Sequence, residues 1–231
     1  MARTIQPERF GQLVQVATST FICRGYRLTQ MADVASALGV AKGTVYGYVD
    51  SKEALFDAAV RFADGHLPLP DPSKLPLPVP GPRSTLNYIR DRLAADGRET
   101  VLARVIDGTL AIDDPSEELA AVFSDLYQRI AQNRLAMKLV DRCATEYPEL
   151  AAVWFGEGRW VQHQLLVKLI KTRSKQRLRS VEHPEVVARS ILETIAFWAM
   201  HRHFDAAPQQ VDDAVAQKAV IDLLVNGLLE K

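Results

Sequence analysis

Apolar residues recur at three- and four-residue spacing along most of this chain, and that spacing predicts a helical protein. The clearest stripe lies in residues 8–24 and is formed by Phe10, Leu13, Val14, Ala17, Phe21 and Ile22. Gly25 follows at the position expected for a helix C-cap. No stretch shows the sustained alternation of a half-buried strand, and no repeat of fixed period is present. We therefore predict an all-α fold without a sheet.

Two short helices are predicted after the first one. Thr29 is expected to cap the first of them, which carries Met31, Val34, Ala35 and Leu38. Gly39 ends that helix, because glycine readily adopts the backbone conformation that terminates one. The second short helix is expected over about 41–48.

A fourth helix and a proline-rich segment come next. Asp50 and Glu53 resemble a capping box, in which Asp50 accepts a hydrogen bond from the Glu53 amide, and the helix is expected to reach about Asp64. In residues 68–82 the prolines at 68, 70, 72, 76, 78, 80 and 82 exclude helix and favour extended chain. A stiff connection and a docking site for a partner domain are both compatible with this segment.

Longer helices are predicted over the rest of the chain. They cover Ser84 to about Asp96, about 98–112, Asp114 to about Cys143, Pro148 into the basic run of Lys171 to Arg179, 185–204 and 211–229. The start at Asp114 is well defined, since aspartate caps the helix, Pro115 takes its first position and Glu117 its third. Gly156 and Gly158 interrupt a strong helical stretch, which indicates a kink or a portal to a pocket.

Composition and charge limit the class of protein. Apolar residues make up 48% of the chain and charged residues 24%, which is the usual range for a globular protein. No long apolar run or signal-type N-terminal stretch occurs, so we expect no membrane association and a cytoplasmic location. Net charge is zero, yet residues 1–52 hold six basic and three acidic side chains. This N-terminal segment therefore has a net charge of +3, and residues 53–231 have a net charge of −3. Cys23 and Cys143 are expected to be buried and reduced.

Residues 29–49 place two short helices on either side of a tight turn at Gly39. Ala35 is small enough for close helix approach, and the residues expected to face inward are Leu38, Val40 and Val45. A helix pair of this kind, braced by another helix, presents its second helix to the major groove of DNA. The sequence therefore predicts a helix-turn-helix head.

This stretch resembles the TetR family of bacterial transcriptional regulators over about residues 10–60. The matching elements are Phe21, Gly25-Tyr26, Thr29, Val34-Ala35, Leu38-Gly39-Val40, Lys42-Gly43-Thr44-Val45-Tyr46, Tyr48 and Ser51-Lys52-Glu53-Ala54-Leu55. Val49 stands where an aromatic residue is commoner, and Gly47 where a larger one is frequent. The resemblance implies a DNA-binding domain over 1–52 and a helical ligand-binding and dimerisation domain over 53–231.

The resemblance also implies DNA contacts at individual positions. The implied set is Thr29, Lys42, Gly43, Thr44, Tyr46, Tyr48 and Lys52. Lys42 and Thr44 would read base edges, the glycine would let the backbone approach closely, and the others would reach phosphates. A core position for Tyr48, a solvated helix start for Lys52 and a simple cap for Thr29 stay open.

A homodimer is expected because one head with few base contacts would bind DNA weakly. Two heads roughly 34 Å apart would read a palindromic operator. The helix over 211–229 is apolar over more than half its circumference, with a polar strip near Lys218, Asp222 and Asn226, and the helix over 185–204 is similar. We predict pairing through these two helices, as the resembling family pairs, and burial within one monomer is the alternative.

The middle helices are expected to hold a small-molecule pocket, as they usually do in the resembling family. Candidate wall residues are Tyr88, Phe123, Tyr127, Met137, Trp154, Phe155, Trp160, His163 and Trp198. Aromatic side chains among few polar groups suit a small apolar or aromatic effector. Most of these residues are equally expected in the core.

No motif indicates an enzyme, a cofactor or a metal ion. The chain lacks a Gly-x-Ser-x-Gly elbow, a phosphate-binding loop and a dinucleotide fingerprint. His201 and His203 would point about 200° apart on a helix and would not share one ion, while Arg202 beside them is expected in solvent. The predicted function is a ligand-responsive regulator, preferably a repressor, with activation left open. The alternative is a helical small-molecule or protein-binding module without a DNA function.

Overall fold

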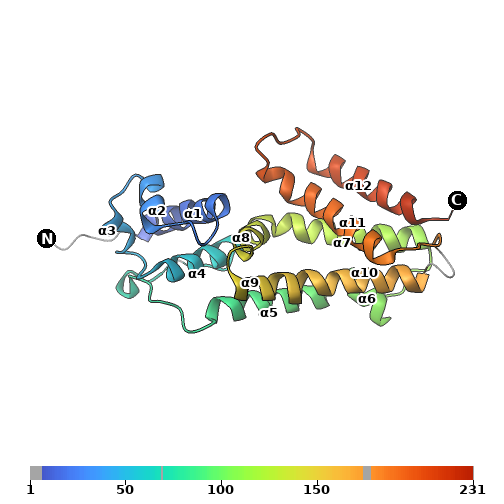
Figure 1. Ribbon diagram of the computed structural model, residues 1–231, viewed down its shortest axis with the longest axis horizontal. Helices are drawn as coiled ribbons and strands as arrows, with labels where there is room; N and C mark the ends of the chain where they lie inside the picture. The colour runs from blue at the N-terminus through green and yellow to red at the C-terminus, as the bar shows by residue number, and fades with distance from the viewer. Residues whose placement is uncertain (1–6, 69, 174–177, 231) are drawn as a thin grey trace. The chain divides into compact units, whose positions relative to one another are not determined.

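The computed structural model describes residues 7–68, 70–173 and 178–230, and these ranges are mostly helical (Figure 1). The α-helices are α1 (Pro7–Arg24), α2 (Met31–Leu38), α3 (Lys42–Val45), α4 (Lys52–Ala63), α5 (Ser84–Arg98), α6 (Val101–Asp107), α7 (Pro115–Gln132), α8 (Arg134–Ala144), α9 (Pro148–Ala151), α10 (Trp160–Arg173), α11 (Pro184–Ala199) and α12 (Asp213–Leu228). The described residues contain no strand, only isolated bridges between Val49 and Leu77 and between Leu178 and Leu229. The predicted all-α fold is confirmed.

The chain forms two compact units. The first contains Met1–Ile89 and Leu135–Trp154, and therefore includes α1 to α4 and α9. The second contains Arg90–Arg134 and Phe155–Lys231, and therefore includes α6, α7 and α10 to α12. Over the part of the chain that the structure describes, no helix is long and apolar enough to cross a bilayer.

The apolar stripe of α1 forms the centre of the first unit's core. Phe10, Leu13, Val14, Ala17 and Phe21 are all buried, and α1 packs on both α2 and α4. Gly39 ends α2 with a φ of 71°, a left-handed conformation that suits glycine, and its amide donates to Ser36. This compact turn leads directly into α3.

The caps of α2 and α4 differ from the predicted ones. Gln30 rather than Thr29 occupies the N-cap of α2, and the Thr29 hydroxyl donates instead to the Gly25 carbonyl at 2.7 Å. Ser51 rather than Asp50 caps α4, where its hydroxyl accepts from the amide of residue 54. At α4 a second competent side chain lies one position nearer to the helix and makes the cap, whereas at α2 the carboxylate of Asp33 accepts from the Gln30 amide.

Several helices are shorter than the apolar pattern predicts. α3 has four residues instead of the eight expected, and Gly47, a weak helix former, lies just beyond it. α6 is capped by Thr100 and ends at Gly108, whose φ is 82°. The predicted helix over 114–143 is two helices, α7 and α8, separated at Asn133, where the backbone leaves the helical region.

Three segments adopt tighter or wider helical turns. A 3-10 turn, Pro72–Lys74, occurs within the proline-rich segment, contrary to the prediction that this segment contains no helix. Asp71 caps the turn and proline suits its first position. The kink expected at Gly156 and Gly158 is a π-helical stretch, Ala152–Arg159. The predicted helix over 185–204 ends at Ala199 and continues as a 3-10 turn, His201–Phe204.

The core of the second unit lies among α6, α7, α10, α11 and α12. It contains Leu102, Leu119, Phe123, Tyr127, Leu166, Ile191, Ile195 and Val220. Beside this core the partly exposed Arg173 binds both carboxylate oxygens of the buried Glu118. Breaking a pair of this kind leaves an uncompensated charge, so it favours one register of α7 against α10.

The two cysteines differ in burial. Cys143 is buried and its thiol lies against the Phe21 carbonyl, whereas Cys23 is exposed on α1. The expectation that both are buried is therefore wrong for Cys23, which lies on the solvent side of a helix whose apolar stripe is already complete without it.

Candidate nucleic-acid interface

Three of the predicted DNA-contacting residues lie on the exposed side of α3. Lys42, Gly43 and Tyr46 are all exposed, and the Lys42 ammonium nitrogen lies 5.8 Å from the centroid of the Tyr46 ring. A Cβ added at Gly43 would meet nothing within 4 Å. This side of α3 therefore presents a cation and a phenol next to backbone that another molecule can approach closely.

Thr44 and Tyr48 point toward the protein interior. Thr44 is 8% exposed, and its hydroxyl oxygen has no hydrogen-bond partner among the described residues. Tyr48 is 3% exposed, and its ring lies 6.3 Å from that of Phe10. Tyr48 thus helps to hold α3 against α1, the core position that the sequence left open.

Thr29 and Lys52 support the turn that follows α1. Thr29 is buried and hydrogen-bonded to Gly25, as described above. The Lys52 ammonium donates to the carbonyl of Tyr26 at 3.1 Å and lies 4.6 Å from the centroid of its ring. Phosphate contacts by these two residues, like base contacts by Lys42 and Thr44, stay predictions.

Aromatic rings fill the space beneath this turn. Tyr26 stacks on Phe21 and on Tyr147, and it meets Phe56 edge to face. Burial first, and then the neighbouring charge of Glu53, raise the pKa of the Tyr26 hydroxyl above its usual range. The phenol therefore stays neutral and donates to the Glu53 carboxylate.

A clamp from α8, which was not predicted, also holds this turn. Arg142 donates to the carbonyl of Arg24 at 2.9 Å and to the carboxylate of Glu146 at 2.7 Å. Glu146 accepts in turn from the amide of Arg27. The hydrogen bond from Arg142 lowers the pKa of Glu146, so the carboxylate stays charged at neutral pH. No sequence signal marks these residues, because their partners are far away along the chain.

The candidate effector-binding residues are divided between the two units. Tyr88, Met137 and Trp154 belong to the first unit. The Tyr88 hydroxyl donates to Asp64 and its ring faces Arg61, while the indole nitrogen of Trp154 donates to Asp141 at 2.8 Å. The hydroxyl of Tyr88 and the indole N–H of Trp154 are therefore already hydrogen-bonded within the protein.

The remaining candidates belong to the second unit: Phe123, Tyr127, Phe155, Trp160, His163 and Trp198. Phe123 and Tyr127 are fully buried in its core, whereas Trp160 is 57% exposed and stacks on His163. The nine candidates thus do not share one environment. Which of them face an effector stays a prediction.

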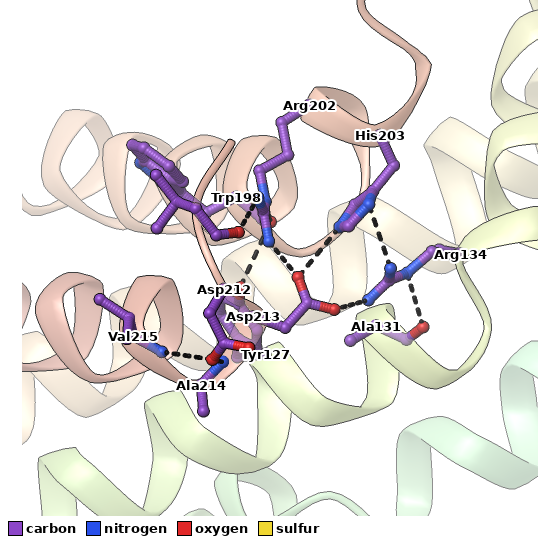
Figure 2. Close-up of polar contacts among 11 residues, drawn as sticks. Tyr127, Ala131, Arg134, Trp198, Arg202, His203, Asp212, Asp213, Ala214 and Val215 are labelled. Atoms are coloured by element: carbon purple, nitrogen blue, oxygen red, sulfur yellow. Dashed lines mark hydrogen bonds and ion pairs between the residues drawn. The ribbon is translucent and has the colours of Figure 1, made fainter. Parts of the chain in front are cut away.

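An ionic cluster joins the first residue of α8, the 3-10 turn His201–Phe204 and the start of α12 in the second unit, and Figure 2 shows its members pointing toward Asp213. Arg202 and Arg134 bind the two oxygens of the Asp213 carboxylate, and His203 lies 3.2 Å from it. Arg202 is buried, so the expectation that it is solvated is wrong; the carbonyls of Trp198 and Val211 each accept from it at 2.8 Å. Over the described residues, no group of three or more metal-ligating side chains occurs.

An apolar stripe is exposed along α12. Val215, Ala219, Leu223 and Gly227 follow one another at four-residue spacing and are all exposed. On α11, Val186 and Phe197 are 63% and 41% exposed. Exposed apolar side chains in such a row are typical of a helix face that another helix covers.

Comparison with known proteins relates the first unit to DNA-binding regulators. Residues 13–59, which span α1 to α4, match the family model described as bacterial regulatory proteins, tetR family. The chain is also 28% identical over 223 residues to the HTH-type transcriptional repressor KstR2 of Rhodococcus jostii (strain RHA1), an alignment that covers 95% of this chain and 91% of that protein.

Solved structures show the same fold. The ketosteroid transcriptional regulator KstR2 of Mycobacterium tuberculosis superposes with a TM-score of 0.60 at 18% identity, covering 96% of each chain. AibR in complex with isovaleryl coenzyme A and operator DNA superposes with a TM-score of 0.53 at 20% identity, covering 94% of this chain and 98% of AibR. Both similarities extend well beyond the helix-turn-helix segment.

Proposed function

This chain belongs to the tetR family of bacterial regulatory proteins, and we propose that it is a repressor that binds a palindromic operator as a homodimer and leaves it when a small effector binds. The observation that carries the proposal is the exposed side of α3, where Lys42, Gly43 and Tyr46 stand clear of a buried apolar core. The family consists of regulators rather than enzymes, and we propose no catalytic activity, cofactor or metal. The proposed location is the cytoplasm, where operator DNA lies.

We propose that some side chains of the head contact base edges, while others contact phosphate or hold the head together. The Lys42 ammonium donates to guanine acceptors in the major groove, while Tyr46 donates to phosphate. The Thr44 hydroxyl is buried and unpartnered in the free protein, so a base contact by Thr44 requires its side chain to turn outward when DNA binds. Thr29, Tyr48 and Lys52 act chiefly by holding the head rigid, because each is already engaged within it.

The dimer is proposed to form through α11 and α12. The exposed stripe of α12 lacks a cover in the single chain, and a second copy related by a twofold axis would bring the same stripe against it. Two heads then face successive turns of the major groove. A small effector that binds preferentially to a different separation of the heads would shift the population away from DNA.

The effector is proposed to be a small molecule with a sizeable apolar or aromatic part, held by the second unit. The aromatic side chains of Phe155, Trp160 and Trp198 are only partly buried there and supply the surface that such a ligand needs. A protein of this fold, AibR, has been captured with isovaleryl coenzyme A together with operator DNA, which supports a regulator that carries both sites.

Selection of duplexes from a random pool tests the proposal. The wild-type protein should enrich a palindromic sequence, with affinity that falls steeply as salt rises. Lys42→Ala should lose preference at the base pairs that Lys42 reads, whereas Lys168→Ala, which removes an exposed lysine of α10, should select the same sequence as wild type. If the wild-type protein enriches no sequence, and its duplex binding does not depend on salt, the proposal of a DNA-binding regulator is wrong.

A further inference from the structure

Proline occupies every second position in residues 75–80, whose sequence is Leu-Pro-Leu-Pro-Val-Pro. We call this segment the strap. Because proline has no N–H, only residues 75, 77 and 79 can donate a main-chain hydrogen bond. In extended chain, successive main-chain groups point to opposite sides, so the donors of residues 77 and 79 share one side, while the N–H of Leu75 donates to Pro72 within the preceding 3-10 turn. The alternation therefore gives the strap one side that can form hydrogen bonds and one that has no donor.

The donor side of the strap meets the turn that connects α3 to α4. The amide of Leu77 donates to the carbonyl of Tyr48 at 2.8 Å, and the carbonyl of Leu77 accepts from the amide of Asp50 at 2.9 Å. These two bonds form the parallel bridge between Leu77 and Val49. Pro76 and Pro78 fall on the opposite side, where proline costs no hydrogen bond and offers no edge to another strand.

The other constraints on the turn that the strap holds are short-range main-chain hydrogen bonds to α3 and the burial of Tyr48. α3 has only four residues, and neither of its ends has a side-chain cap. Gly47, within the turn, adds backbone freedom, and a helix this short has little stability of its own. Val49 is fully buried beside the bridge. The N-terminal end of α3 is set by the Gly39 turn, so the strap supplies the matching constraint at its other end.

We propose that the strap is a working part of the DNA-binding head and that the main chain of Leu77 is a positioning group, which fixes the orientation at which α3 enters the major groove. This inference rests on the proposed DNA-binding function. It assigns the proline-rich segment a role beyond connecting α4 to α5. It also places that role in the backbone, so the identity of the side chain at 77 matters less than the presence of its N–H.

Leu77→Pro tests the inference, since it removes that N–H while keeping the extended backbone that the neighbouring prolines already impose. Binding is measured with the duplexes that the wild-type protein selects from a random pool. Leu77→Pro should weaken binding to them at least about tenfold and flatten the preference at the bases read by α3, because the Tyr48 carbonyl loses its donor. Leu77→Ala keeps the N–H and should bind within about twofold of wild type.

Val79→Pro is the matched control, since it adds a proline to the strap at an exposed residue beyond the bridge. It should bind and select like wild type. The inference is overturned if Leu77→Pro retains the affinity and base preference of wild type. It is also overturned if Leu77→Ala and Val79→Pro lose as much affinity for DNA as Leu77→Pro does.

Amide hydrogen exchange of the wild-type protein decides the matter if Leu77→Pro fails to fold. The amides of Leu77 and Asp50 should exchange as slowly as those in the middle of α4, whereas exchange at the rate of open chain would overturn the inference. The same measurement separates two failures. If the wild-type protein selects no duplex, the proposed function fails, and the exchange rates alone still report whether the strap holds the turn after α3.

Discussion

The carboxylate of Glu146 accepts a hydrogen bond from the main-chain amide of Arg27 at 3.0 Å, across 119 positions of the sequence. Arg142 completes the contact by donating both to Glu146 and to the carbonyl of Arg24. These two side chains of the α8–α9 region thus bind the backbone of the turn that ends α1. The Lys52 ammonium donates to the Tyr26 carbonyl in the same turn. A movement of α8 would therefore be transmitted directly to the helix-turn-helix head.

Gly25→Ala should destabilise the first unit markedly. Gly25 has a φ of 82°, and a Cβ added to it would overlap the carboxylate oxygens of Glu146 and a guanidinium nitrogen of Arg142. The left-handed backbone alone costs about 1–2 kcal/mol for a residue with a side chain. Displacing Glu146 from its hydrogen bonds adds about 1–3 kcal/mol. Urea unfolding monitored by circular dichroism measures the total decrease in the free energy of unfolding.

Gly39→Ala separates these two contributions. Gly39 also has positive φ, 71°, but a Cβ there would meet nothing within 4 Å. The Gly39→Ala substitution should therefore lower the free energy of unfolding only by the cost of the left-handed backbone, about 1–2 kcal/mol. Equal losses for the two variants would show that the clamp on Gly25 contributes nothing to stability.

The head could be predicted from the sequence because its information is local. The stripe of α1, the Gly39 turn and the α2–α3 spacing each follow from residues within one or two turns of each other. The caps were misplaced because adjacent residues, such as Asp50 and Ser51, compete for one position and only the backbone path decides between them. The spacing of apolar residues continues through Asn133, which is why the break between α7 and α8 leaves no mark in the pattern.

The contacts between distant segments could not be predicted in the same way. Arg142, Glu146 and Leu77 carry no motif, and their partners are the main chain of residues far away in the sequence. Arg202 was expected in solvent because arginine usually is, yet three hydrogen bonds compensate its burial. For the effector site, residue type alone did not separate core aromatics such as Phe123 from exposed ones such as Trp160.

Arg202→Met should cost about 2–4 kcal/mol of stability. The substitution keeps an apolar stem but removes every donor to the carbonyls of Trp198 and Val211 and to Asp213. Arg189→Met is the control, since Arg189 is 53% exposed and pairs with Glu193 only one turn away on α11. Exposed pairs of this kind contribute little, so its unfolding free energy should change by less than about 1 kcal/mol. Similar losses in the two variants would contradict a structural role for the buried arginine.

Stability should fall on mild acidification, and His203 should account for part of the fall. Burial first, and then the positive charge of Arg134, lower the pKa of His203 below its ordinary 6.5, although Asp213 opposes them. The unfolded chain therefore takes up a proton at a higher pH than the folded protein does. Stability decreases as pH falls from about 6.5 toward the lowered pKa, and the loss is complete below it.

His203→Gln tests this dependence, because glutamine can still donate to Asp213 but does not titrate. The free energy of unfolding is measured in urea at pH values of about 7.5 and 5.5, a window that lies above most carboxylate titrations. The difference between the two pH values should be smaller in the variant than in wild type. An equal or larger difference would mean that His203 is not disfavoured as a cation in the folded protein.

Leu223→Glu should separate the dimer. Leu223 is 67% exposed at the centre of the α12 stripe, so the proposed interface would bury a glutamate against the same residue of the second copy or its neighbours. An unpaired charge buried in this way costs several kcal/mol, which corresponds to dimer dissociation at concentrations at least about a hundredfold higher than for wild type. The control is Lys218→Glu, which changes the charge on the polar strip of the same helix. This variant should remain dimeric. Sedimentation over a range of concentrations distinguishes the two, and affinity for the palindromic duplex should fall only in Leu223→Glu, since one head reads only half of it. A Leu223→Glu protein that stays dimeric would place the interface on another face of the chain.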